Sequence, residues 1–402
     1  MFRSFNLDRA YQYLLITLAF LLPLTVFGGN LIIVIITILW LLSGGYKSKL
    51  VEIFSNKLLC ASIAFFFLHV LGLIWTEDLS WGLHIVHKMW YFLLLFPIFF
   101  TIVKKDYIKY YISAFLLAIS LTEFLSYLIW FELIPQFKHA TLYNPVPFMS
   151  HISYNPILAF AIYLVSHEIL FNNNLGRIKK PLYVFFAITM TTNMFITGGR
   201  AGQVMFFAVA VILIFQYFNT QKIKALIVSS VLIPIIFITA YQTSDIFNDR
   251  VNLAYQNVAT YSDNKNTSLG KRITFTINSL EVIKANLFFG VGTGDFPSEY
   301  KKINEINTPE MINPTNPHNM YILILVQLGL IGLVGLLTIF YYQYRAALSS
   351  SNKFIRDVGV TLPTLFLLIM WSDSYLLGHY TTLLFIFFSS CLLYTSPSPR
   401  DS

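Results

Sequence analysis

Twelve apolar stretches divide this chain of 402 residues. A helix needs about 20 mostly apolar residues to cross the roughly 30 Å of hydrocarbon in a bilayer, and most of the stretches reach that length. They lie near residues 10–28, 30–44, 57–75, 86–103, 107–131, 151–171, 181–197, 200–218, 223–241, 318–343, 354–372 and 380–395. The second and the last are short for a span. The pattern predicts an all-α polytopic membrane protein with about twelve transmembrane helices.

Charge is scarce in this sequence. Only 11% of the residues are charged, whereas a soluble globular chain carries roughly 25%. A charge at the bilayer centre costs about 2.5–3.5 kcal/mol, so we expect most charges in loops. The net charge of +8 is not gathered on one soluble face, which argues against a nucleic-acid partner. Cys60 and Cys391 lie in apolar runs, unlike the cysteines of a disulfide framework.

Basic residues alternate from loop to loop. If the N-terminus is cytoplasmic, seventeen of the twenty-seven Lys and Arg fall on the cytoplasmic side, and only Lys88, Lys138 and Arg200 lie opposite them outside one long loop. This bias predicts cytoplasmic N- and C-termini. No small-residue cleavage site follows the first apolar run, so no cleavable signal peptide is expected.

The stretch between the ninth and tenth spans is the one long segment of mixed charge. We therefore expect helices 1–9 over residues 1–241, a loop on the outer side over 242–317 and helices 10–12 over 318–395. The tail at 396–402 is unlike the rest, is expected to be non-native or to mark a truncated end, and is left out of the fold. Within the loop, Ser268–Leu287 has apolar residues three to four apart and is predicted as an amphipathic helix. Gly290, Gly292 and Gly294 then predict a turn.

Three polar features lie at the predicted outer interface. The first is the turn Thr197–Gln203, in which Gly198 and Gly199 allow positive φ and Arg200 enters the next helix. A cation at a helix N-terminus opposes the helix dipole, which suits a site that grips an anion with amides and guanidinium together. An interfacial Arg that snorkels to the headgroups fits the position equally well.

The second feature is Asn316–Asn319, directly before an apolar run. Asn316 as N-cap and Pro317 as the first helical residue predict a helix start there, with His318 at the helix mouth. A helix N-terminus favours the neutral imidazole, which can accept a proton. On position alone His318 can be structural or catalytic. Gly329, Gly332 and Gly335 follow as a small-residue stripe for helix packing.

The third feature is Lys271 with Arg272 in the amphipathic helix. A solvated basic face explains them in isolation. The predicted topology, however, places Arg200, Arg272 and His318 on one side of the membrane. Two Arg and a neutral His suit an anionic diphosphate leaving group and a hydroxyl that must lose a proton.

Other polar residues have weaker signals. Glu123 lies in the fifth span and is expected to face a polar cavity, whereas Asp373 and His379 form the last outer turn with no assignable role. The outer loops contain no Asp-rich Mg²⁺ motif, so metal-independent chemistry without a cofactor is expected.

These residues resemble the O-antigen ligase family, which includes O-antigen ligases, O-antigen polymerases and protein O-oligosaccharyltransferases. Asn286 and Leu287 stand where the family often has His and Pro, and the resemblance covers about residues 195–335. It rests on the turn Thr197–Gln203, on Gly270, Lys271 and Arg272, on Phe289–Phe296, and on His318 and Asn319 followed after nine residues by Gly329 and Gly332.

The resemblance implies a GT-C-type inner-membrane glycosyltransferase that inverts the anomeric carbon without a metal. Arg200 and Arg272 would bind the diphosphate of an undecaprenyl-linked glycan, and His318 would activate the acceptor hydroxyl. Lys271 and Asn319 would also contact substrate. The expected acceptor is lipid A-core, reached on the periplasmic face of the bilayer.

Two alternatives remain open at the level of sequence. A polymerase of the same family would use a second polyprenyl-linked glycan as acceptor, but an Arg followed eleven residues later by Gly is absent at Arg200, Arg250 and Arg272. A transporter or lipid flippase would show two related halves and broken helices near the midplane, and the sequence has no internal repeat.

Overall fold

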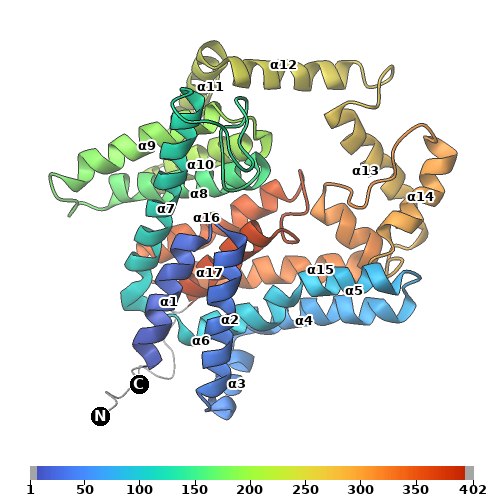
Figure 1. Ribbon diagram of the computed structural model, residues 1–402, viewed down its shortest axis with the longest axis horizontal. Helices are drawn as coiled ribbons and strands as arrows, with labels where there is room; N and C mark the ends of the chain where they lie inside the picture. The colour runs from blue at the N-terminus through green and yellow to red at the C-terminus, as the bar shows by residue number, and fades with distance from the viewer. Residues whose placement is uncertain (1–6, 394–402) are drawn as a thin grey trace. The chain divides into compact units, whose positions relative to one another are not determined.

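The computed structural model describes residues 7–393, so the predicted tail at 396–402 lies outside the described part. The described residues form helices and connecting loops, with no strand among them (Figure 1). The predicted all-helical class is therefore confirmed for this part of the chain.

Each of the twelve predicted stretches overlaps a helix in the structure. The stretch predicted at 86–103 lies in one helical run, Leu79–Ile102, made of α5 (Leu79–Lys88), a π-helical turn (Tyr91–Leu95) and α6 (Phe96–Ile102). The other eleven are α1 (Leu7–Leu21), α2 (Val26–Leu42), α4 (Lys57–Leu71), α7 (Ile108–Trp130), α8 (His151–Phe171), α9 (Lys179–Phe195), α10 (Arg200–Phe218), α11 (Lys222–Thr243), α15 (Met320–Ser349), α16 (Lys353–Ile369) and α17 (His379–Leu393).

Not all of these helices are long enough to cross a bilayer. Among the described residues, seven helices have the length and apolar composition of a span, or eight if α2 and the bent helix that follows it, α3 (Tyr46–Ser55), count as one. The helices α1, α9, α16 and α17 have 15–17 residues, short of the usual 20. The chain is a multi-pass membrane protein, and the number twelve stays a prediction.

The chain divides into two compact units. The first unit contains Ile36–Lys105 and the part from Ala254 onward, and the second contains Arg9–Ile35 and Asp106–Leu253. Lys271, Arg272, His318 and Asn319 therefore belong to the first unit, and Arg200 belongs to the second.

The predicted amphipathic helix at 268–287 is present as α13 (Ser268–Ala285), and the side chain of Thr267 caps its first turn by accepting a hydrogen bond from the amide of Gly270. The face that it buries, however, matches the predicted apolar one only in part. Ile283 is buried, but Ile277 and Leu280 are 46% and 42% exposed. Asn278 is buried instead, because its amide nitrogen donates to side-chain oxygens of the neighbouring segment: Tyr300, Asn304 and Thr308.

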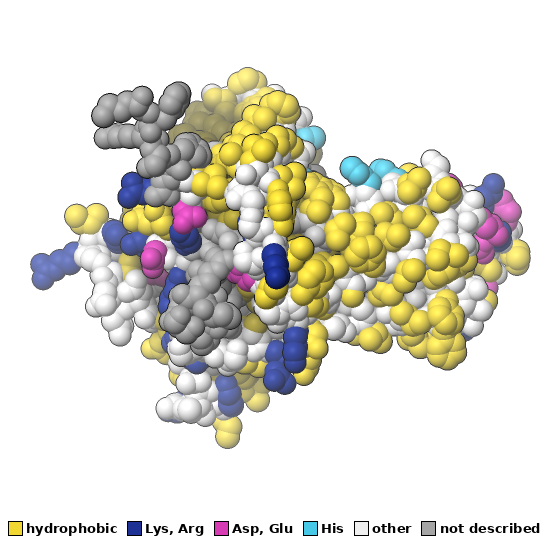
Figure 2. Space-filling model, turned by 90° about the horizontal axis from the view of Figure 1, so that it is seen from below, with side chains coloured by type: hydrophobic (Ala, Val, Ile, Leu, Met, Phe, Trp, Pro, Cys, Tyr) yellow, Lys and Arg dark blue, Asp and Glu magenta, His cyan; other side chains and the backbone are white. Residues whose placement is uncertain are grey.

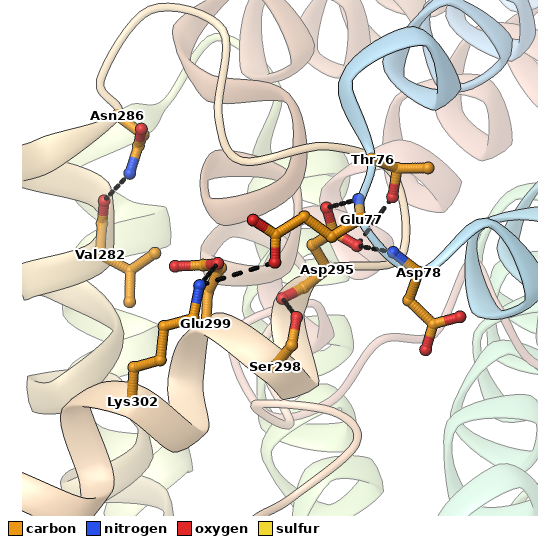
Figure 3. Close-up of polar contacts among 9 residues, drawn as sticks. All are labelled: Thr76, Glu77, Asp78, Val282, Asn286, Asp295, Ser298, Glu299 and Lys302. Atoms are coloured by element: carbon orange, nitrogen blue, oxygen red, sulfur yellow. Dashed lines mark hydrogen bonds and ion pairs between the residues drawn. The ribbon is translucent and has the colours of Figure 1, made fainter.

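The segment from Asn286 to Asp295 joins α13 to α14 (Phe296–Asn307) and is held at Asp295 (Figure 3). The carboxylate of Asp295 accepts hydrogen bonds from the hydroxyl of Thr76 at 2.8 Å and from the amides of Glu77 at 2.7 Å and Asp78 at 2.9 Å. Three donors to one buried carboxylate fix the start of α14 against the turn between α4 and α5.

Gly329 interrupts α15, where its φ of 61° and ψ of −156° are not helical. The segment before α14 fills the break. Val291 and Gly292 donate their amides to the carbonyls of Val326 and Gln327, at 2.8 and 3.0 Å. In return, the carbonyls of Leu287 and Phe288 accept from the amides of Leu330 and Ile331, at 2.9 and 3.4 Å.

Glycine is required on both sides of this contact. A Cβ on Gly329 would lie 2.4 Å from the carbonyl carbon of Phe288, and a Cβ on Gly290 would lie 2.4 Å from that of Gln327. Both distances are far below van der Waals contact. Gly329 thus serves a break in the helix rather than the predicted packing stripe, whereas Gly335 does face α4, since its Cβ would lie 2.6 Å from Leu68.

Candidate functional site

His318 stands in a short loop at the mouth of α15. Its φ of 53° lies in the left-handed region, which His adopts more often than most residues. The side chain of Asn316 holds this conformation by accepting hydrogen bonds from the amide of His318 at 2.8 Å and from the hydroxyl of Ser374 at 2.9 Å.

The helix begins later than the sequence predicts. Asn316 and Pro317 were expected as N-cap and first helical residue, but α15 starts at Met320 and its cap is Asn319. The side-chain oxygen of Asn319 accepts from the amides of Tyr321 at 3.0 Å and Ile322 at 3.2 Å. The prediction was wrong because the Asn316 side chain bonds within the loop, which turns His318 out of the helix.

His318 forms a pair with Asp373, a residue to which the sequence assigned no role. The Nδ1 atom of His318 lies 3.2 Å from Oδ1 of Asp373, with side chains 42% and 20% exposed respectively. When the carboxylate accepts from Nδ1–H, the Nε2 atom keeps a lone pair that can accept a proton. The pair therefore has the arrangement of a general base and the group that orients it.

The helix α13 carries Arg272, whose positive charge reaches Asp373. Burial opposes ionisation of Asp373, but the hydrogen bond to His318, the amide of Ser374 and the positive charge of Arg272 together hold its pKa below the ordinary value. One turn further along α13, the ring of Phe275 stacks on the imidazole of His318, with centroids 6.5 Å apart and planes at 22°. Helix α13 thus supplies both a cation and an apolar wall.

Tyr375 is a further buried polar residue near His318 and Asp373. It is 5% exposed, and burial together with the negative charge of Asp373 raises the pKa of its hydroxyl, against the opposing effect of Arg272. Lys271 precedes Arg272 on α13 and is half-buried. The first unit therefore brings Arg272, His318 and Asp373 together, with Lys271 and Asn319 next to them in sequence.

Arg200 belongs to a second polar centre, in the other unit. It is the first residue of α10, and the turn before it is tied to α8. The hydroxyl of Thr197 donates to the side-chain oxygen of Asn155 at 2.9 Å, the amide nitrogen of Asn155 donates to the carbonyl of Gly199 at 3.3 Å, and the amide of Gly198 donates to the side chain of Asn144 at 2.9 Å.

The glycines of this turn are needed because they are small and not because they adopt a positive φ. Gly199 has a φ of −83°, and neither Gly198 nor Gly199 is among the residues with positive φ, so the turn does not use the positive φ that these glycines allow. A Cβ on Gly199 or Gly202 would lie 2.6 or 2.2 Å from atoms of Asn155. The missing side chains let α10 approach α8 closely.

A second guanidinium lies over the same turn. A Cβ on Gly198 would stand 2.8 Å from Nη2 and 3.0 Å from Nε of Arg250, so the guanidinium of Arg250 packs directly against the backbone next to Arg200. Sequence reasoning missed this residue because the two Arg are fifty positions apart. In the second unit, Arg200 and Arg250 flank one helix N-terminus, which is an arrangement that suits an anion.

Two residues noted in the sequence lie elsewhere. Glu123 is 2% exposed within α7, among side chains of the second unit, and the ring nitrogen Nδ1 of His379 lies 2.5 Å from the hydroxyl of Tyr91. Across residues 7–393, no three His, Cys, Asp or Glu side chains gather into a set that could hold a metal ion.

Comparison with known proteins supports the resemblance read from the motifs. Residues 185–337 match a family model described as O-antigen ligase, and this segment includes Arg200, Arg272 and His318 but not Asp373. No curated protein matches the chain. The resemblance to the O-antigen ligase family is thereby confirmed over these residues.

Proposed function

We propose that this chain, with its O-antigen ligase segment at 185–337, transfers a glycan from undecaprenyl diphosphate to lipid A-core on the periplasmic face of the inner membrane. The family match itself supports a membrane glycosyltransferase of the ligase and polymerase group. The observation that carries the proposal is the pairing of His318 with Asp373 beside Arg272, because it provides a base and a cation in one place.

In the proposed reaction, a hydroxyl oxygen of the acceptor attacks the anomeric carbon of the donor sugar. A new carbon–oxygen bond forms while the bond to the diphosphate breaks, and its electron pair leaves with the diphosphate oxygen. The proton of the hydroxyl passes to Nε2 of His318, whose Nδ1 atom is held by Asp373. Attack from the side opposite the leaving group inverts the anomeric carbon.

Arginine side chains are proposed to stabilise the diphosphate as it leaves. Arg272 and Arg200 would carry this role, with Arg250 as a further contact because its guanidinium lies against the turn that leads into Arg200. Guanidinium groups remain charged at any physiological pH and bind phosphate oxygens in pairs. This charge supports a mechanism without a metal. Lys271 and Asn319 are also proposed to contact substrate.

The test is transfer by the full chain in proteoliposomes. A polyprenyl-diphosphate glycan is supplied with lipid A-core or with a second glycan carrier, and the labelled product is identified. We expect product on lipid A-core, lost in His318→Ala and Arg272→Ala and retained in Lys301→Ala, a matched control at an exposed Lys of α14. Product on the second carrier would indicate a polymerase, and transfer that survives in His318→Ala would overturn the proposed base.

A further inference from the structure

Three consecutive apolar side chains stand exposed in the segment that fills the break of α15. Leu287, Phe288 and Phe289 are 41%, 63% and 63% exposed. Single exposed apolar residues are ordinary on protein surfaces, but a contiguous group that contains two Phe requires an explanation. We call these three residues the apolar tip.

The apolar tip is bonded directly to a helix that is built to cross the membrane. Helix α15 has 30 residues and is long and apolar enough to cross a membrane. The carbonyl of Phe288 accepts from the amide of Ile331, and the carbonyl of Leu287 accepts from that of Leu330. The position of the tip relative to the bilayer is therefore set by residues 330 and 331 of α15.

The exposed face of α15 on the C-terminal side of this contact is apolar. Ile331, Val334, Leu337 and Tyr341 are 43%, 63%, 41% and 52% exposed and recur at the spacing of one helical face, which ends at the exposed Arg345. In a spanning helix this face contacts lipid, since nothing else in the chain covers it within the described residues. The apolar tip continues the same surface beyond Ile331.

Helix geometry gives the depth of the tip. Arg345 avoids the hydrocarbon and marks the level of the headgroups on its side. Ile331 stands fourteen residues before Arg345 in α15, which at a rise of 1.5 Å per residue is about 21 Å. Because the hydrocarbon core is roughly 30 Å thick, Ile331 and the bonded Phe288 fall inside it, in the leaflet on the His318 side.

The backbone around the tip is suited to this environment. Polar backbone groups in hydrocarbon must be paired within the protein. The amides of Gly290, Val291 and Gly292 and the carbonyls of Leu287 and Phe288 all have backbone partners. Figure 2 shows acidic and basic side chains gathered at its right-hand end, where α14 lies in Figure 1, next to a broad hydrophobic surface.

We infer that Leu287, Phe288 and Phe289 are inserted among the lipid acyl chains as a re-entrant tip, so that the segment between α11 and α15 is anchored in the membrane rather than standing wholly outside it. The occupant of the exposed apolar surface is the bilayer itself. The tip follows α13 directly, and α13 carries Arg272. Anchoring the tip would therefore fix the position of Arg272 relative to the membrane.

The inference is tested by the depth of spin labels in the full chain, reconstituted in nanodiscs. Cys60 and Cys391 are replaced by Ala, and single cysteines are introduced as Phe288→Cys and Phe289→Cys. Val334→Cys on the outward face of α15 is the lipid-facing reference, and Ile306→Cys on α14, where Ile306 is 78% exposed, is the matched apolar residue outside the membrane. Collision rates with oxygen and with a water-soluble nickel complex are compared at each site.

We expect Phe288→Cys and Phe289→Cys to match Val334→Cys, with high oxygen and low nickel collision rates, and Ile306→Cys to show the reverse. Nickel accessibility at both tip sites equal to that of Ile306→Cys would overturn the inference. If one tip variant elutes as an aggregate, the other decides the result, since the two residues are equally exposed. The measurement does not depend on transferase activity, so it stands apart from the proposed function.

Discussion

The Nδ1 atom of His318 lies 3.2 Å from Oδ1 of Asp373, and this bond joins the mouth of α15 to the turn between α16 and α17. The two residues are fifty-five positions apart, and the family match ends before the second of them. A carboxylate in this place orients the imidazole and selects the tautomer that leaves Nε2 as acceptor. We therefore expect Asp373 to be a positioning residue whose effect passes through His318.

Replacing Asp373 tests that role. In Asp373→Asn an amide can donate to Nδ1 and so favour the tautomer in which Nε2 carries the hydrogen, which cannot accept a proton. We expect kcat to fall by about 10²-fold or more, with the KM for the donor little changed, as measured by steady-state transfer in proteoliposomes. Asp373→Glu restores part of the rate. A rise in KM at constant kcat would contradict the role.

Acid stability gives a second measurement on the same pair. Burial opposes ionisation of Asp373, but His318, Ser374 and Arg272 outweigh it and lower its pKa. A lowered folded-state pKa contributes stability that is present above the unfolded value, near 3.9, and is lost as the pH falls through the folded value. The thermal midpoint of the wild type should fall more steeply below about pH 5 than that of Asp373→Asn. Parallel curves would contradict this coupling.

The break in α15 predicts a large effect of a single methyl group. Gly329→Ala places a Cβ 2.4 Å from the backbone of Phe288, at a φ of 61°. We expect a loss of about 1–3 kcal/mol in the free energy of unfolding from the backbone strain alone, measured in detergent. Gly176→Ala is the matched control, because nothing lies within 4 Å of its added Cβ. Equal stability of the two variants would show that the loop can withdraw from α15.

Arg250 yields a prediction in the second unit. If its guanidinium contacts the diphosphate, Arg250→Ala should lose a charge-assisted hydrogen bond of about 1.5–3 kcal/mol and raise the donor KM by roughly 10- to 100-fold. Arg250→Lys keeps the charge without the paired geometry and should be intermediate. The exposed Lys301→Ala is the control for net charge. An unchanged donor KM in Arg250→Ala would remove this residue from the site.

The positions of the helices could be predicted from sequence because they depend on local properties. Apolar stretches of 15 to 25 residues bounded by basic loops specify membrane helices almost independently of the rest of the chain. The break at Gly329 could not be predicted in this way. Three glycines at regular spacing are also typical of close helix packing. Only the contact of the loop Leu287–Gly292 with α15 shows that Gly329 marks a break in the helix and not a packing position.

The roles of the candidate site residues stay a prediction. Arg272 and His318 were chosen for charge and position, and in the structure His318 bonds to the carboxylate of Asp373, which the charge of Arg272 also reaches. Asp373 and Arg250 were missed because a contact between distant residues leaves no mark on local spacing. The buried face of α13 was misjudged for a related reason: the Asn278 side chain finds three partners on the following segment, so a polar residue is more favourable there than the apolar pattern indicates.

The interrupted helix also bears on how the chain enters the membrane. Its first part, Met320–Leu328, is too short to cross a bilayer alone, and the backbone groups on either side of Gly329 find partners in residues 287–292. Those residues precede α15 in the chain and so leave the ribosome first. When α15 is released for insertion, the segment that pairs with its backbone has already been synthesised. The helix can therefore enter the membrane without a stage in which the backbone groups around Gly329 face lipid without hydrogen-bond partners.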